Sequence, residues 1–235
     1  DRTQEVARQF GAHVIVFQWN GHYPKKRNWF LLNHSVSTPW VLFLDSDEYV
    51  NNSFCNEIAL LAKSKDTSGF WLTYANHFLG KRLRFGIKQR KLALFRFGIA
   101  FYERIDEDHW SDLDMEVHEH PIVDGKIGSI KTPIEHRDYK GLAHFLSKHC
   151  EYAKWEAARY SRVNRYPETW NLFTNRQKFK YRNMAKWWYP LVYFLTSYIA
   201  KGGFLDGAAG FHHSAYKLWY FQSTRIIINE VESRQ

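Results

Sequence analysis

The chain has 235 residues, 45% of them apolar and 18% aromatic, which is enough for one large folded domain and excludes wholesale disorder. Its two cysteines, Cys55 and Cys150, exclude a disulfide framework and a C-x-x-C zinc site, so we expect a reducing compartment, the cytosol. No run of 18 uncharged apolar residues occurs, which excludes an ordinary membrane-spanning helix.

The formal net charge of +9 is confined to the second part of the chain. Residues 1–136 carry 17 basic and 17 acidic residues, whereas residues 137–235 carry 16 basic and 7 acidic residues. The second part also holds 22 of the 42 aromatic residues. Basic charge interleaved with aromatic side chains predicts an anionic partner, either a phospholipid surface or a nucleic acid.

The first half of the chain alternates helical and strand patterns. Asp1 and Ser53 are expected to cap helices, and the unbroken apolar run WVLFL predicts a strand buried on both faces. The alternation is typical of an α/β layer around a sheet. We expect helices at residues 1–10, 25–36 and 53–65, and strands at residues 13–17, 40–44 and 69–78.

The pattern then changes twice. Residues 80–136 predict short strands at 91–96 and 126–130 around an acidic loop, an arrangement typical of a segment that carries a site. Residues 141–165 have helical periodicity and predict a long amphipathic helix, followed by a basic aromatic segment, a small-residue turn at 202–211 and a last helix. The basic side of the long helix is expected to carry Lys148, Lys154, Arg159 and Arg162.

The sharpest chemical signal is the acidic motif Asp45-Ser46-Asp47-Glu48, directly after the apolar run. Open α/β sheets bind ligands at the carboxyl ends of their strands, and carboxylates two residues apart can offer oxygens to a divalent cation. Mg²⁺ or Mn²⁺ suits this ligand set, and such ions usually bridge to substrate phosphates. The alternative is that the acids only cap the next helix or form a turn.

The order of motifs resembles the inverting family 2 glycosyltransferases, and is closest to the bacterial enzymes that build lipopolysaccharide core and other envelope glycans. The resemblance covers nearly the whole chain. It implies a GT-A type nucleotide-binding sheet over residues 1–136 and a helical, membrane-associating region over 137–235. Asp1-Arg2-Thr3 matches the end of a family segment, which implies that the family's first strand, helix and second strand are missing from this chain. The motifs are DRT, QWNGHYPKKRN, WVLFLDSDEYV, EVHEH and IEHRDYKGLAHFLSKHCEYAKWEAARY.

This resemblance implies a role for several residues. Asp45 would face the ribose or diphosphate of a nucleotide-sugar donor, and Asp47 would ligate the metal. Lys25 and Arg27 would contact phosphates. Arg27 is the better candidate for this contact, because its fork geometry matches phosphate oxygens. The alternative for this basic cluster is a solvated helix start.

An inverting transfer needs one base to deprotonate the acceptor hydroxyl. The resemblance implies Glu119 for this role, and Asp114 and Glu116 in the same loop are alternatives. A histidine could complete the metal site, and His136 matches a recurring family position more closely than His118 does. Most single histidines are structural. His212 and His213 are adjacent, and adjacent residues on a helix face different ways, so we interpret them as structural or interfacial.

Three interpretations compete for residues 141–225: membrane attachment, core packing and nucleic-acid binding. Residues 187–195 form a Trp/Tyr-rich stretch preceded by Lys178, Lys180, Arg182 and Lys186, which suits a helix in the headgroup plane of an anionic leaflet. Pro190 would kink or start a helix there. No nucleic-acid motif is found, so we favour membrane attachment. The resemblance implies a peripheral protein at the cytoplasmic face of the inner membrane, where such enzymes meet lipid-linked acceptors.

Together these features predict a metal-dependent, inverting hexosyltransferase of lipopolysaccharide or envelope-glycan biosynthesis. It would move a sugar from a nucleotide-sugar to a lipid-linked acceptor, with Mg²⁺ or Mn²⁺ as cofactor. The alternative is a non-catalytic protein of the membrane surface, derived from such an enzyme and lacking its nucleotide pocket.

Overall fold

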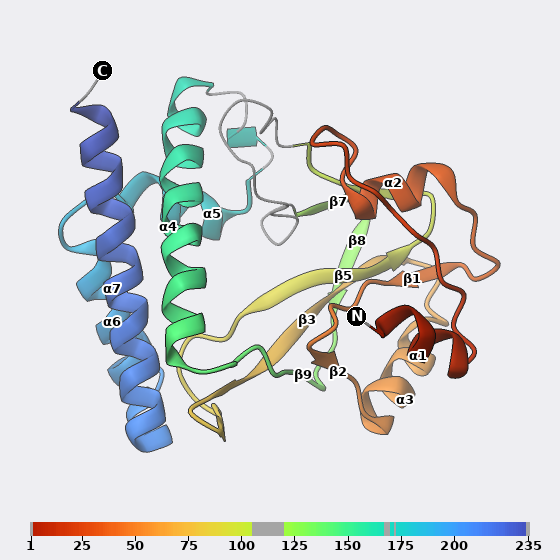
Figure 1. Ribbon diagram of the computed structural model, residues 1–235. Coiled ribbons are helices and arrows are strands. Elements are labelled where there is room, and N and C mark those ends of the chain that lie inside the picture. Colours follow the sequence, from red (N-terminus) through yellow and green to blue (C-terminus); the bar gives the residue numbers. More distant parts are fainter. Residues whose placement is uncertain (1, 105–119, 167–169, 172, 234–235) are drawn as a thin grey trace.

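The computed structural model describes residues 2–104, 120–166, 170–171 and 173–233. It is a mixed α/β structure, with a sheet in the first part of the chain and helices in the second (Figure 1). The strands are β1 (Trp40–Leu42), β2 (Glu48–Tyr49), β3 (Thr67–Phe78), β4 (Lys81–Arg82), β5 (Arg90–Arg96), β6 (Ala100–Tyr102), β7 (Pro121–Val123), β8 (Lys126–Ser129) and β9 (Ile134–His136). The helices are α1 (Thr3–Gln9), α2 (Lys26–Asn33), α3 (Asn52–Leu61), α4 (Leu142–Arg165), α5 (Asn175–Asn183), α6 (Tyr189–Leu195), the π-helical η3 (Thr196–Ala200), the 3-10 turn η4 (Gly203–Asp206) and α7 (Gly207–Glu232).

The long strand β3 is the centre of the sheet. In the described residues the strand order is β1-β5-β3-β9-β2, and β4 and β8 also pair with β3. β5 is antiparallel to β3, whereas β8 and β9 are parallel to it. β1 is antiparallel to β5 and therefore runs in the direction of β3. The carboxyl ends of β1 and β9 thus lie toward the same end of the sheet.

Two expectations for the strands are wrong. Residues 13–17 form no strand, and Val16 is 58% exposed, because β-branched residues favour a strand only where a neighbouring strand accepts and donates the backbone hydrogen bonds. The run at 40–44 gives only β1, whose residues are half-buried rather than buried on both faces. β1 lies at the end of the strand order beside β5 alone, and an apolar run does not distinguish an edge strand from a central one.

Several helix boundaries also differ from expectation. The N-cap of α1 is Arg2 rather than Asp1, and α2 ends at Asn33 rather than at residue 36. α3 is capped by Asn51, whose side chain accepts a hydrogen bond from the backbone N–H of Phe54, rather than by Ser53. It ends at Leu61 instead of Lys65, before β3 begins. The small-residue segment at 202–211 is not one turn, since η4 ends at Asp206 and α7 starts at Gly207. Alanine favours helix, and the unfavourable helix propensity of glycine is offset here because α7 packs against α4.

A small aromatic cluster joins the sheet to the helices. Phe78, at the end of β3, contacts Tyr139, Phe145 of α4 and Tyr216 of α7 at ring-centroid distances of 4.9, 5.2 and 6.2 Å. The predicted boundary at residue 136 falls just before this cluster, between β9 and α4. The cluster fixes the segment after β9, which carries part of the site described below.

The helical core contains charged residues. Glu156 of α4 is 1% exposed, and its carboxylate accepts hydrogen bonds from Lys180 (2.6 Å) and Tyr181 (2.5 Å). Arg159, expected on the exposed basic side of the helix, is instead 6% exposed and donates to the buried Glu103 at 3.0 Å. The expectation for Arg159 is wrong because the pairing partners come from other elements, and helical periodicity cannot reveal them.

No helix in the described part of the chain has both the length and the apolar character needed to cross a bilayer. Pro190 occupies the first turn of α6, so it starts a helix, one of the two placements expected for it.

The folded protein is expected to lose stability as the pH falls from 7 to 5. Burial, together with the charge of Lys217, lowers the pKa of both His149 and His213 to about 3. Each histidine stays neutral when folded but binds a proton near pH 6.5 when unfolded, so acid favours the unfolded chain. At pH 5 the loss is about 2 kcal/mol per histidine.

Urea unfolding at pH 7 and pH 5 tests this expectation. The difference between the two free energies of unfolding should shrink in His213→Phe and stay unchanged in His212→Phe, because the neighbouring His212 is exposed. An equal difference in both variants would contradict the assignment to His213.

Candidate functional site

The acidic motif after β1 forms a tight turn that Glu48 holds closed. The backbone N–H of Glu48 donates to the carbonyl of Asp45 at 3.0 Å, and the Glu48 carboxylate accepts from the backbone N–H of Asp45 at 3.0 Å. This carboxylate is fully buried, and it also accepts from the Tyr74 hydroxyl (2.6 Å) and from Lys91. Glu48 therefore shapes the turn, which leaves the more exposed Asp45 and Asp47 to present their oxygens.

Asp45 is surrounded by positive charge. Arg27 donates to Oδ1 of Asp45 at 2.5 Å, and Nζ of Lys91 lies 3.7 Å from Oδ2. Burial alone would raise the pKa of Asp45, but the charges of Arg27 and Lys91 outweigh it and hold the pKa below its usual value. The guanidinium also lies over the ring of Tyr102, 5.3 Å from the centroid, which further fixes its position.

His136 reaches the same turn through strand pairing. β2 and β9 are antiparallel with Glu48 opposite His136, and the backbone N–H of Arg137 donates to the carbonyl of Asp47 at 2.9 Å. Nε2 of His136 lies 3.7 Å from Oδ2 of Asp47. The pairing of two short strands thus brings side chains 89 positions apart in the chain into one group.

The orientation of the His136 ring leaves Nε2 available as a ligand. Nδ1 of His136 lies 3.1 Å from Oδ1 of Asn76, and the amide nitrogen of Asn76 donates to Gln89 at 3.0 Å. Since the amide oxygen faces the ring, Nδ1 is the donor of this hydrogen bond, so the neutral imidazole has its lone pair on Nε2. A metal-binding histidine usually donates a hydrogen bond from the ring nitrogen that does not face the metal.

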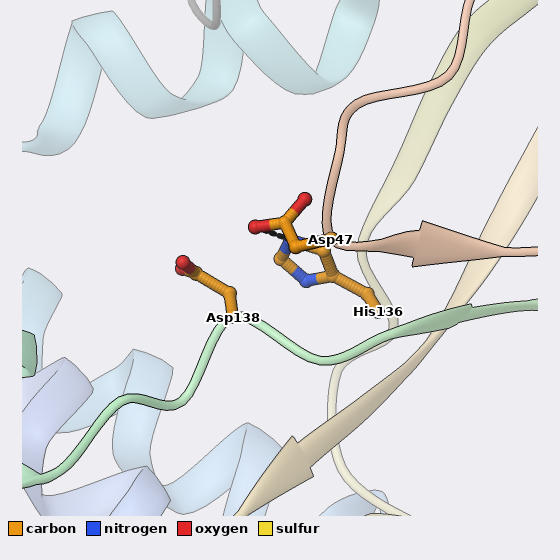
Figure 2. Close-up of side chains that lie close together, drawn as sticks. All are labelled: Asp47, His136 and Asp138. Carbon is orange, nitrogen blue, oxygen red and sulfur yellow. Dashed lines mark ion pairs between the residues drawn. The ribbon is translucent and has the colours of Figure 1, made fainter. Parts of the chain in front are cut away.

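Asp47, His136 and Asp138 form the only group of three metal-ligating side chains found in the described residues. One ligand atom from each residue lies within 4.8 Å of the others. Figure 2 shows Asp47 on the turn, His136 at the end of β9 and Asp138 on the segment that follows β9. Two carboxylates and one imidazole fit a divalent cation that keeps further positions for water or substrate.

Lys148 of α4 neutralises part of this cluster. Its Nζ lies 2.9 Å from both carboxylate oxygens of Asp138. Burial lowers the pKa of Lys148, but its hydrogen bond to Asp138 and the nearby Tyr152 and Asp138 charges outweigh burial and raise the pKa above its usual value. A metal that binds Asp138 must therefore share this carboxylate with the Lys148 ammonium group or displace the ammonium group from it.

The structure brings some of the predicted site residues together and separates others. Asp47 and His136 form part of the metal-ligating group, and Asp45 and Arg27 form an ion pair beside it. Lys25 is only 4% exposed at the start of α2, with Nζ 5.9 Å from the centroid of the Trp19 ring. Glu119 lies outside the described residues, as do Asp114, Glu116 and His118.

Asp138 is the site residue that the sequence reasoning missed. His136 and Asp138 are two positions apart where the chain leaves β9, and in extended backbone such residues face the same side. The same spacing drew attention to Asp45 and Asp47, so the signal was present. Lys148 and Asn76 carry no comparable sequence signal, because only the packing of α4 and β3 against this segment brings them close.

Comparison of the chain with models of protein families, with curated proteins and with solved structures finds no match.

Proposed function

We propose that this protein is a metal-dependent inverting glycosyltransferase with a GT-A type nucleotide-binding sheet. The observation that carries the proposal is the convergence of Asp47, His136 and Asp138 at the D-x-D-E motif, which begins three residues after the end of β1. Catalytic Mg²⁺ and Mn²⁺ ions are typically held by a few carboxylates and leave coordination positions for substrate phosphates. The imidazole in this set favours Mn²⁺ over Mg²⁺.

The three ligating side chains would hold the cation, which when bound supplies positive charge that stabilises a departing nucleoside diphosphate. Arg27 and Lys91 already lie beside Asp45 and add fixed positive charge at the same end of the sheet. Asp45 would orient the ribose or diphosphate of the nucleotide-sugar. Arg27 would direct some of its guanidinium N–H groups toward a phosphate of the same molecule. Lys25, the other predicted phosphate contact, would have to leave its buried position to do so.

Glu119 is the proposed base that takes the proton from the acceptor hydroxyl during attack on the anomeric carbon. Glu103 and His120, which lie on either side of Glu119 in the sequence, are joined by two hydrogen bonds. The backbone N–H of Glu103 donates to the carbonyl of His120 at 2.9 Å. The backbone N–H of His120 donates to the Glu103 carboxylate at 3.1 Å. Arg159 holds that carboxylate from α4. These bonds fix Glu103 and His120 in the fold.

The proposed acceptor is a lipid-linked or lipopolysaccharide envelope glycan, met at the cytoplasmic face of the inner membrane. The excess of basic and aromatic residues after residue 136 supports an acceptor at an anionic surface.

Calorimetric titration of UDP, GDP and CDP, each with Mn²⁺ and with a chelator, tests the proposal. Binding that requires Mn²⁺ is the expected result. Liposome binding without any metal-dependent nucleotide binding would instead favour the non-catalytic surface protein.

Glu119→Gln is expected to lower turnover by about 10²-fold or more, because the amide cannot accept the proton. Its affinity for the nucleotide should stay close to that of the unchanged protein, since Glu119 acts on the acceptor. Turnover is measured by release of nucleoside diphosphate. Unchanged turnover would remove Glu119 from the role, and the same assay on Glu116→Gln and Asp114→Asn would test the neighbouring acids.

A further inference from the structure

Exposed apolar side chains form a stripe along α6 and η3. Leu191, Leu195 and Ile199 are 47, 49 and 58% exposed, although they belong to a continuous helical stretch packed against α7. Residues four positions apart on a helix share a face. The opposite face of α6 is core, because Tyr189 and Tyr193 contact Phe221 of α7 at ring-centroid distances of 5.2 and 4.6 Å.

The stripe continues onto η4 and the start of α7. Phe204, Leu205 and Phe211 are 50, 58 and 44% exposed. The ring of Tyr198 in η3 lies 6.3 Å from that of Phe204 and 5.6 Å from that of Phe211, so these residues adjoin the stripe. Apolar side chains of this size are rarely gathered on the surface of a protein without a binding partner.

A loop of the sheet completes this surface. The carboxylate of Asp206 accepts from the backbone N–H groups of Arg84 and Phe85 at 3.0 and 2.9 Å, which ties the loop between β4 and β5 to η4. Phe85 is 41% exposed and lies with Leu205 around Gly202, where an added Cβ would be 3.4 and 3.3 Å from the two side chains. We call the whole surface the apolar patch: Phe85, Leu191, Leu195, Ile199, Phe204, Leu205 and Phe211.

Positive charge accompanies the apolar patch. Between Lys178 and Phe211 the chain carries five basic residues and one acidic residue, Asp206, whose carboxylate is bound to backbone N–H groups. Lys186, Lys201 and Arg84 are exposed, and Trp187, next to Lys186, is 68% exposed. Lysine is depleted in protein interfaces, whereas lysine, arginine and tryptophan are enriched where proteins meet the headgroups of an anionic bilayer.

We propose that the apolar patch docks on an anionic lipid bilayer. The side chains of Leu195, Ile199 and Leu205 enter the boundary between headgroups and acyl chains, and Arg84, Lys186 and Lys201 contact lipid phosphates. The surface differs from the Trp/Tyr stretch expected from the sequence, because Tyr189 and Pro190 are buried and Lys180 is bound to Glu156. This proposal does not depend on the chemistry proposed for the metal-ligating group.

Vesicle flotation tests the docking surface. The chain is mixed with vesicles of phosphatidylcholine containing 30% phosphatidylglycerol or none, and binding to the anionic vesicles is the expected result. The double variant Leu195→Ser, Ile199→Ser should partition at least tenfold less. Leu60→Ser, which changes a more exposed leucine on α3, should partition as the unchanged chain does. Lys186→Glu with Lys201→Glu should lose the preference for anionic vesicles.

Three of the possible vesicle results would overturn the proposal. They are no binding to either kind of vesicle, binding of the Leu195/Ile199 double variant equal to that of the unchanged chain, and a loss in Leu60→Ser equal to that in the double variant. A change from dimer to monomer in the double variant, measured by light scattering with vesicle binding unchanged, would assign the patch to a second copy of the chain. Mn²⁺-dependent nucleotide binding is measured in the same variants and should not change. The two proposals therefore fail or hold separately.

Discussion

Asp47→Asn is expected to abolish Mn²⁺ binding to the chain and, with it, Mn²⁺-dependent binding of a nucleoside diphosphate. The variant keeps the size and shape of the side chain but removes the charge that faces Nε2 of His136 across 3.7 Å. Loss of a residue that only hydrogen-bonds to a metal ligand typically lowers metal affinity by about 10–100-fold. Loss of a charged ligand should lower the affinity further. Asn76→Ala, which removes only the support of His136, is expected to show the smaller effect.

Lys148→Met is expected to change the affinity for Mn²⁺ in the opposite direction. The variant removes the ammonium group that lies 2.9 Å from both oxygens of Asp138, while methionine retains helix propensity and an apolar stem. Mn²⁺ alone should therefore bind several-fold tighter. Weaker binding would show that Lys148 supports the geometry of the cluster instead of competing with the ion.

Both changes are measured by calorimetric titration of MnCl₂, with Asp66→Asn as the control. Asp66 is an exposed aspartate in the turn before β3, so it shares the charge change without belonging to the cluster. Wild-type affinity in Asp47→Asn would exclude this residue as a ligand. Nucleotide binding that persists in Asp47→Asn without Mn²⁺ would show that the donor site does not use the ion.

Glu156→Ala is expected to destabilise the fold by about 3 kcal/mol, because it leaves polar groups in the helical core without their acceptor. Lys180 and Tyr181 donate to this carboxylate, and the Tyr220 hydroxyl lies 3.5 Å from it. The expected loss is at the lower end of the range for a broken buried pair, since the Lys180 side chain is 28% exposed and can reach water. Glu156→Gln keeps an acceptor oxygen and should lose less.

Urea unfolding of Glu156→Ala and Glu151→Ala gives a matched comparison on one helix. Glu151 pairs with Lys154 at 2.9 Å, and both side chains are exposed, so its loss should leave the free energy of unfolding nearly unchanged. Similar values for the two variants would contradict the importance of the buried network. Far-UV circular dichroism checks that both variants remain helical.

Local sequence patterns predicted the elements that depend on local interactions. The periodicity of residues 141–165 predicted α4 to within one residue, and the apolar stretches predicted β3 and β5 closely. Residues 13–17 show the limit of this reasoning. Their β-branched sequence favours a strand, but a strand also requires a partner, and none of the described strands pairs with them.

The metal-ligating group was predicted only in part, for a related reason. Asp47 follows a predicted strand and His136 ends one, so both could be selected from the sequence. That they meet depends on the antiparallel pairing of β2 with β9, strands of two and three residues whose pairing no sequence pattern predicted. The buried pair of Arg159 and Glu103 escaped prediction in the same way, since each residue alone is typical of an exposed surface.

The contact between Asp206 and the loop of the sheet has a consequence for which substitutions the chain can accept. Asp206 binds the backbone N–H groups of Arg84 and Phe85, so it places no demand on the identity of either side chain. The two loop positions can therefore diverge freely, to suit whatever surface they meet, while their attachment to η4 is retained. Proline is the one residue that this attachment bars from both positions, because it has no N–H to donate.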